Sequence, residues 1–149
     1  MNDTVIVNLS NRHIHLCAED LEILFGKGYQ LKKAKDLLQP GQFAAEESVK
    51  LVGPKGEFSK VRILGPLRDK TQCEIMYSDS FILGITPPKV KESGDLDGSS
   101  GFTIVGPAGS LNKKEGLIIA KRHIHLDPKT AEKMGLKDKE IVSIEAGAN

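Results

Sequence analysis

The segment Asn11-Arg12-His13-Ile14-His15-Leu16 returns near the other end of the chain as Lys121-Arg122-His123-Ile124-His125-Leu126. Each copy follows a short β-rich run, at residues 5–9 for the first copy and 117–120 for the second. Each copy also precedes a stretch with the signals of a short helix. The repeat therefore predicts two related units, each with a strand that ends in a His-x-His motif.

The helix signals are clearest after the second copy. Asp127 can cap the helix, Pro128 suits its first position, and Gly135 ends it. After the first copy, Gly26 closes a short amphipathic stretch in the same way. Both units are thus expected to continue from a strand into a short helix.

Most of the remaining pattern is β-like. Two similar turns, Gly53-Pro54-Lys55-Gly56 and Gly106-Pro107-Ala108-Gly109, separate runs of apolar and β-branched residues. Many short strands, frequent turns and few helices favour a mainly β fold with short helices, of the α+β type, built as two related small β-barrel units. The further strands are expected at residues 61–64, 73–77, 102–105 and 141–144.

The small and polar stretch at residues 89–101 has the composition of a linker. We therefore expect a first β-barrel unit at residues 1–92 and a second at 93–149, each with one His-x-His motif. Only 24 residues follow His125, so the second barrel is expected to be incomplete.

Composition excludes several classes of protein. The chain has 149 residues, a formal net charge of +1 and 5% aromatic residues, which gives no basis for binding nucleic acid or an anionic membrane. No apolar stretch is long enough for a membrane helix, and the N-terminus lacks the pattern of a signal peptide. Two cysteines do not form a secreted disulfide framework. A cytoplasmic protein is expected.

The four histidines of the chain all lie in the two repeated motifs. Residues two apart on a strand point to the same side, so each motif presents two imidazoles in one direction. Imidazole is a common zinc ligand. A single motif is more typical of structural histidines than of a metal site, but two copies that include every histidine favour zinc sites at His13 with His15 and at His123 with His125.

Two more residues are candidates for the same chemistry. Arg68 follows a Gly-Pro turn, where a guanidinium can fork onto phosphate, and Glu74 can supply an oxygen ligand to a metal. Arg12 and Arg122 stand beside the histidine pairs, where they either attract an anion or form salt bridges with carboxylates. Cys17 stands where the second copy has its capping Asp127, and a small semi-buried residue is favoured there over a thiolate ligand.

Five motifs of the chain belong together: Ser10-Asn11-Arg12-His13-Ile14-His15-Leu16, Leu64-Gly65-Pro66-Leu67-Arg68, Thr71-Gln72-Cys73-Glu74-Ile75, Ser93-Gly94-Asp95-Leu96 and Ala120-Lys121-Arg122-His123-Ile124-His125-Leu126. They resemble phosphate propanoyltransferase, the phosphotransacylase of propanediol utilisation and related bacterial microcompartment pathways. The resemblance covers essentially the whole chain in order. It implies two β-barrel units with a dinuclear zinc site between them, and reversible transfer of a propanoyl or acetyl group between coenzyme A and phosphate.

The resemblance assigns a role to each candidate residue. His13, His15 and Glu74 resemble the ligands of one zinc, and His123 with His125 two ligands of the other. Arg68 resembles the arginine placed near phosphate. Family members continue past Asn149 and supply a further histidine ligand. This chain is therefore expected to lack the C-terminal part of the family's fold, which leaves open whether the 149-residue form is active.

The expected partners are a coenzyme A thioester and phosphate, and the resemblance leaves a homo-oligomer, other microcompartment enzymes and a microcompartment location open. The sequence lacks a nucleophile elbow and a spare histidine base, which favours direct attack of phosphate on the thioester. Two alternatives remain. A zinc-dependent hydrolase would use the same ligands to activate water, and a truncated, non-catalytic relative would bind zinc only.

Overall fold

The computed structural model describes Val5 and residues 9–145 of the chain. It divides into two compact units, one from Leu9 to Arg122 and one formed by Met1–Asn8 together with His123–Asn149. Within the described residues, the elements in chain order are β1 (His13–His15), α1 (Ala18–Phe25), β2 (Lys33–Asp36), β3 (Phe43–Val52), β4 (Glu57–Gly65), β5 (Gln72–Glu74), α2 (Tyr77–Leu83), β6 (Val90–Lys91), β7 (Ser100–Val105), β8 (Ser110–Ala120) and α3 (Pro128–Lys133).

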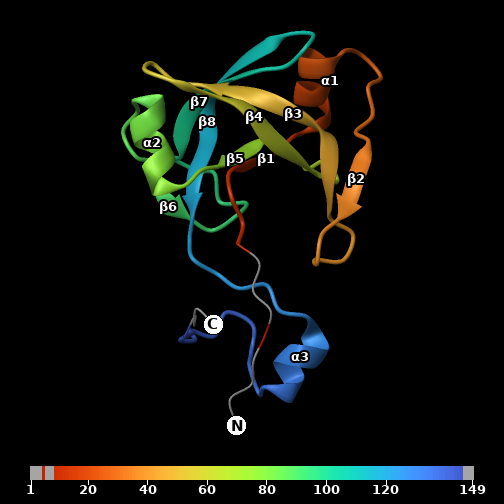
Figure 1. Cartoon of the computed structure of the whole chain (residues 1–149), viewed down its shortest axis with the longest axis vertical. Helices are drawn as coiled ribbons and strands as arrows, with labels where there is room; N and C mark the ends of the chain where they lie inside the picture. Colours follow the sequence, from red (N-terminus) through yellow and green to blue (C-terminus); the bar gives the residue numbers. More distant parts are fainter. Residues whose placement is uncertain (1–4, 6–8, 146–149) are drawn as a thin grey trace. The chain divides into compact units, whose positions relative to one another are not determined.

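Six strands of the Leu9–Arg122 unit close into a barrel (Figure 1). The ring runs β3-β4-β1-β5-β8-β7 and returns from β7 to β3. β2 extends the sheet beside β3, and β6 extends it beside β8. The prediction of a mainly β fold with short helices is confirmed.

β1 and β5 are neighbouring strands of the barrel and pair with each other in antiparallel orientation. On its other side, β1 pairs in parallel with β4, and β5 pairs in parallel with β8. The register sets His13 opposite Glu74, Ile14 opposite Cys73, and His15 opposite Gln72. Directly opposed residues of an antiparallel pair share a face of the sheet. Both histidines and Glu74 therefore point to the same side, and Ile14 with Cys73 point to the other.

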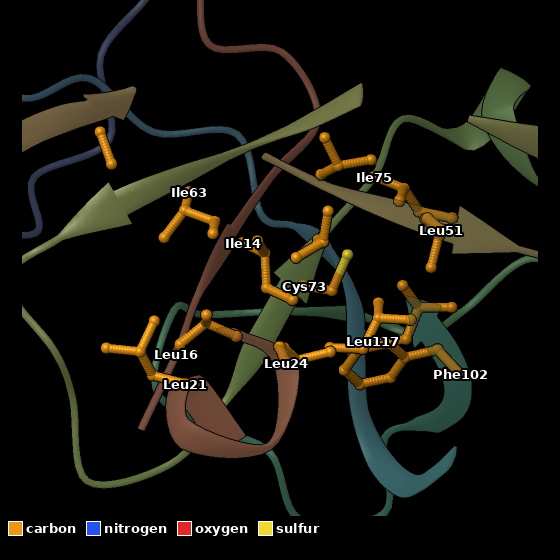
Figure 2. Packing of buried hydrophobic residues seen from close by; sticks show 14 of the residues in the cluster. Ile14, Leu16, Leu21, Leu24, Leu51, Ile63, Cys73, Ile75, Phe102 and Leu117 are labelled. Atoms are coloured by element: carbon orange, nitrogen blue, oxygen red, sulfur yellow. The ribbon is translucent and has the colours of Figure 1, made fainter. Parts of the chain in front are cut away.

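The other side is the hydrophobic core. Figure 2 shows Ile14 and Cys73 at its centre, with Leu24 and Leu117 packed around them. Ile14 and Cys73 have no exposed surface. The isoleucine between the two histidines therefore anchors β1 from behind, because it points to the opposite face of the strand from them.

The two predicted Gly-Pro turns join β3 to β4 and β7 to β8. In each turn the first glycine N–H donates to the carbonyl of the last glycine, at 2.9 Å from Gly53 to Gly56 and at 2.8 Å from Gly106 to Gly109. The two hairpins are thus built alike. One half of the ring consists of β1, β3 and β4 and the other of β5, β7 and β8, and each half contains one of these hairpins.

Each helix of the barrel unit ends against the turn of the opposite half. The Leu24 carbonyl of α1 accepts from Ala108 N at 2.9 Å, and the Leu83 carbonyl of α2 accepts from Lys55 N at 3.0 Å. A Cβ on Gly106 would collide with the Leu24 carbonyl oxygen. Glycine is therefore required where the helix end meets the turn, and α1 and α2 lie on different sides of the barrel (Figure 1).

The helix ends follow the predicted signals. α1 ends at Gly26, whose N–H donates to the Glu22 carbonyl at 2.8 Å. α3, in the other unit, begins with Pro128 after Asp127, and the Asp127 carboxylate accepts from Thr130 N at 3.0 Å. Among the described helices, none combines the length and apolar character that crossing a membrane requires.

Two of the strand predictions are wrong in whole or in part. The expected strand at 73–77 is wrong beyond Glu74, because Tyr77 already begins α2. Residues 141–144 form no strand, and no described residue pairs with them. The strand expected at 5–9 lies largely outside the described residues.

The division at 92/93 also differs from the compact units seen here. β7 and β8 follow that position, and they pair with β3 and β5, which precede it. Residues on both sides of 92/93 therefore complete one barrel, because its ring closes only through them. A second barrel unit around the second His-x-His motif remains a prediction.

Candidate metal centre

Three side chains predicted as ligands come together at β1 and β5. One ligand atom from each of His13, His15 and Glu74 lies within 4.8 Å of the other two. All three residues are buried, with exposures of 8%, 3% and 8%. Two imidazoles and a carboxylate, fixed on paired strands and shielded from water, form a donor set suited to a divalent metal.

His13 is oriented by the chain that leads into β1. Its Nδ1 lies 2.8 Å from the Asn11 carbonyl oxygen. A carbonyl oxygen can only accept, so Nδ1 carries the proton and Nε2 of the neutral ring keeps its lone pair. Nε2 faces Glu74 Oε2 at 3.4 Å. A backbone carbonyl that fixes the tautomer in this way is a common support for a metal-bound histidine.

The second histidine, His15, has a buried ring nitrogen, Nδ1, that forms no hydrogen bond with any described residue. Burial lowers the pKa of His15 to about 3, helped by the positive charge of Arg68 and by His13, against a backbone hydrogen bond with Leu64 that raises it. The ring is therefore neutral near pH 7. A buried neutral imidazole with a bare nitrogen fits a metal ligand.

Glu74 is held by residues that the sequence interpretation did not single out. Gln72 Nε2 donates to Glu74 Oε1 at 2.6 Å and to Ser93 Oγ at 3.0 Å. Gly94 N donates to Gln72 Oε1 at 2.7 Å. The Ser93-Gly94 segment, expected to be a linker, thus contacts the candidate centre, and its match to a family motif was the available signal.

Arg68 lies at the edge of the same centre. Its backbone N–H donates to the Leu16 carbonyl at 2.9 Å, and its guanidinium Nη1 donates to Ser93 Oγ at 3.1 Å. Burial lowers the pKa of Arg68, while the charge of Glu74 raises it. Because the charge of Arg68 lowers the pKa of His15, and the charge of Glu74 acts on the pKa of Arg68, this cation adjoins the candidate ligands.

A cavity of about 300 Å³ opens beside Arg68 and His15. Its remaining walls come from the turn before β3 and from the end of β4. An arginine at the wall of a small cavity next to a candidate metal centre suits a phosphate-sized anion. The lining residues are His15, Pro40, Gly41, Gln42, Gly65, Pro66 and Arg68.

Arg12 has a different role from Arg68. Its Nη2 and Nε donate to the two carboxylate oxygens of Asp79 at 2.7 Å and 3.1 Å. The guanidinium also lies over the Phe58 ring, 4.1 Å from its centroid. The salt bridge, and not the anion contact, is therefore the interpretation that holds for Arg12. Arg122 is exposed.

The second histidine pair belongs to the other compact unit. His123 Nε2 and His125 Nε2 lie 3.1 Å apart, and both residues are exposed. Two imidazole nitrogens at this separation can turn toward a common ion. Their role as ligands of a second zinc remains a prediction.

Both cysteines are free and buried. Cys17 stands immediately before α1, where its backbone N–H donates to Thr71 Oγ1 at 3.0 Å. Burial raises the pKa of the Cys73 thiol, as expected of a core residue. Neither cysteine belongs to the His13–His15–Glu74 group among the described residues.

Comparison with known proteins agrees with the resemblance. A sequence model of the phosphate propanoyltransferase family matches residues 6–149. The chain belongs to this family. It is 58% identical over 140 residues to the phosphate propanoyltransferase of Thermotoga maritima, covering 94% of this chain, and 56% identical over 143 residues to that of Rhodopseudomonas palustris, covering 96%.

The family relationship applies to part of each relative. The chain spans 66% of the length of the Thermotoga maritima protein and 63% of that from Rhodopseudomonas palustris. A third relative, the phosphate propanoyltransferase of Rhodobacter capsulatus, is 52% identical over 140 residues, which are 94% of this chain and 65% of that protein. The candidate metal centre lies within the shared part.

Proposed function

We propose that the chain carries the phosphate-binding part of a zinc-dependent phosphate acyltransferase, which moves a propanoyl or acetyl group reversibly between coenzyme A and inorganic phosphate. The observation that supports it most is the group of His13, His15 and Glu74 beside the cavity lined by Arg68. The relatives are named phosphate propanoyltransferase, which supports transfer of a propanoyl group to or from phosphate. Propanediol utilisation or a related pathway is the setting we propose, in the cytoplasm or in a bacterial microcompartment.

The ligands of the first zinc would be His13, His15 and Glu74, and His123 with His125 would bind a second. The unpaired Nδ1 of buried His15 and the carbonyl-fixed tautomer of His13 support this assignment. A zinc ion bound there would supply a Lewis acid for the thioester carbonyl or for the thiolate of coenzyme A.

Arg68 would bind and orient the phosphate. Its backbone is tied to Leu16 and its guanidinium to Ser93, so the cation is already in place before phosphate arrives. A fixed guanidinium binds two phosphate oxygens at once and leaves a third free to attack the thioester. Orientation of this kind can contribute several kcal/mol to lowering the barrier.

Phosphate attack on the thioester needs no nucleophile from the protein. The bond that forms joins a phosphate oxygen to the carbonyl carbon, and the bond that breaks joins that carbon to the coenzyme A sulfur. The candidate ligands are buried, so a thioester carbonyl bound beside them would be shielded from water, which limits hydrolysis. The products are an acyl phosphate and coenzyme A, and the reverse reaction follows the same path.

The test combines metal analysis with a thiol-release assay, using propanoyl-CoA or acetyl-CoA with and without phosphate. The full chain should contain zinc and release thiol only when phosphate is present, and Arg68→Ala should raise the KM for phosphate and lower kcat. A charge-assisted contact of this kind contributes about 1.5–3 kcal/mol. Lys60→Ala, at an exposed cation of β4, is the control.

Three results would contradict the proposal. Absence of zinc after reconstitution would remove the metal centre. Phosphate-independent thiol release that survives Arg68→Ala would indicate a hydrolase. Zinc binding without thiol release, both in this chain and in one extended with the remaining third of a relative, would indicate a binding protein.

A further inference from the structure

Gln72 contacts the candidate metal centre without belonging to its ligands. It lies on β5, directly opposite His15 on β1, and only 1% of its surface is exposed. A buried primary amide needs partners for two N–H groups and for its oxygen. For Gln72, each of these partners is a residue of the centre or of the segment beside it.

The orientation of this amide follows from one contact. Gly94 N lies 2.7 Å from Oε1, and a backbone N–H can only donate. The amide oxygen therefore faces Gly94, and the NH2 group faces the opposite way. Its two hydrogens point to Glu74 Oε1 at 2.6 Å and to Ser93 Oγ at 3.0 Å.

Because of this contact, the two carboxylate oxygens of Glu74 have different neighbours. Oε1 accepts from Gln72, while Oε2 faces His13 Nε2 at 3.4 Å. With Oε1 held, the carboxylate cannot rotate its second oxygen away from the histidines. The carboxylate is thus fixed for one-oxygen coordination before a metal binds.

We propose that Gln72 is a positioning residue of the metal centre, which fixes the Glu74 carboxylate for coordination and is itself fixed by Gly94. This inference rests on the proposed metal centre. Partners that orient a ligand in this way commonly contribute 10–100-fold to metal affinity. The role would also explain why a segment that reads as a linker, Ser93-Gly94, returns to the barrel at this point.

The same network reaches Arg68. Ser93 Oγ accepts both from Gln72 Nε2 and from Arg68 Nη1, at 3.0 and 3.1 Å. One amide therefore connects the carboxylate ligand with the arginine that we assign to phosphate. A change at Gln72 is expected to alter metal affinity first, through its direct and shorter contact with Glu74.

The experiment measures zinc affinity by competition with a chromophoric chelator. Every protein is the full chain with His123→Ala and His125→Ala, so that a single site titrates. Gln72→Met, which keeps the length of the side chain and removes its hydrogen bonds, should bind zinc 10–100-fold more weakly than this parent. Gln30→Met makes the same exchange at an exposed glutamine and should leave the affinity unchanged.

A positioning role predicts dependence on Glu74. In a Glu74→Ala background, Gln72→Met should cause no further loss, because the group that it orients is gone. The visible spectrum of bound Co²⁺ should change in Gln72→Met and stay the same in Gln30→Met. A loss of equal size with and without Glu74 would mean that Gln72 only supports the fold, and would overturn the inference.

The remaining outcomes are also distinct. Zinc affinity in Gln72→Met equal to that of the parent would overturn the inference and leave the metal centre intact. Absence of zinc binding in the parent would overturn both. If Gln72→Met does not fold, Gln72→Asn provides the test: it is one methylene too short to reach Gly94 and Glu74 together, so wild-type affinity there would again contradict the role.

Discussion

Arg12 and Arg68 lie near the same two strands, but they contact different partners. Arg12 forms a two-contact ion pair with Asp79, a side chain that is only 2% exposed, whereas Arg68 contacts Ser93 and lines the cavity. An arginine whose donors are taken by a buried carboxylate stabilises the fold. One that borders a cavity remains available to a ligand.

We therefore expect Arg12→Ala to lower the free energy of unfolding by about 1–3 kcal/mol, because it leaves the buried Asp79 carboxylate without its cation. Urea denaturation measures this change. Arg122→Ala, at an exposed site, should change stability by less than about 0.5 kcal/mol. Equal stability of the two variants would show that the Arg12–Asp79 pair contributes nothing.

Asp20 predicts how stability depends on acid. Burial by itself raises the pKa of Asp20, but hydrogen bonds from Lys113, at 2.7 Å, and Thr71, with the charge of Lys113, lower it below 3.8 overall. A depressed folded-state pKa stabilises the protein above the ordinary value, and this contribution is lost as pH falls through the folded value.

The unfolding free energy of the wild-type chain should therefore fall as the pH drops below about 4. Asp20→Asn should be less stable near pH 7 and should lose less on acidification, because it has no proton to take up. Urea titrations at several pH values measure both slopes. Parallel pH profiles of the two proteins would exclude Asp20 as the source.

The site residues also show what sequence can predict at this scale. His13 and His15 were identifiable because a period of two on a strand places them side by side, and Glu74 because its motif matched the family. Gln72 stands in the same motif but was given no role, since a buried glutamine has the same appearance in a sequence whether it orients a ligand or supports a turn. Its role depends on contacts with Gly94, 22 positions later.

At the scale of elements, the helix ends and the Gly-Pro turns explain each other. The Gly106 turn accommodates the end of α1, and the Gly53 turn accommodates the end of α2. Sequence analysis predicted both turns from their composition. It could not predict which helix meets which turn, because that pairing is set by the closure of the barrel.

Gly106→Ala should destabilise the chain by about 1–3 kcal/mol, because its Cβ would overlap the Leu24 carbonyl oxygen and push α1 from the turn. Thermal unfolding checks this, and Ala108→Ser, at an exposed position of the same turn, should have little effect. An unaltered melting temperature for Gly106→Ala would show that α1 can shift at no cost.

At the scale of the molecule, the candidate ligands join distant parts of the chain. Glu74 follows His15 by 59 positions, yet β5 and β1 are neighbours in the barrel. A metal held by both strands binds only the folded state, so it adds stability through mass action.

Zinc at about 100 times its dissociation constant should add roughly 2.7 kcal/mol, which corresponds to a rise in Tm on the order of 10 °C for a domain of this size. Calorimetry with zinc and with a chelator measures the difference. His15→Ala should lose the shift contributed by this site, while a shift of equal size in His15→Ala would place the stabilising ion elsewhere.

The two halves of the barrel also have a consequence for how the protein is made. The docking turn of α1 lies at Gly106–Gly109, and the last strand of the ring ends at Ala120. While the ribosome is still extending the chain, the first half has neither the turn that holds its helix nor the strands that cover its core. We therefore expect nascent chains that end before β8 to remain open to proteases and chaperones, and protection to arise in one late step when Ser110–Ala120 has emerged.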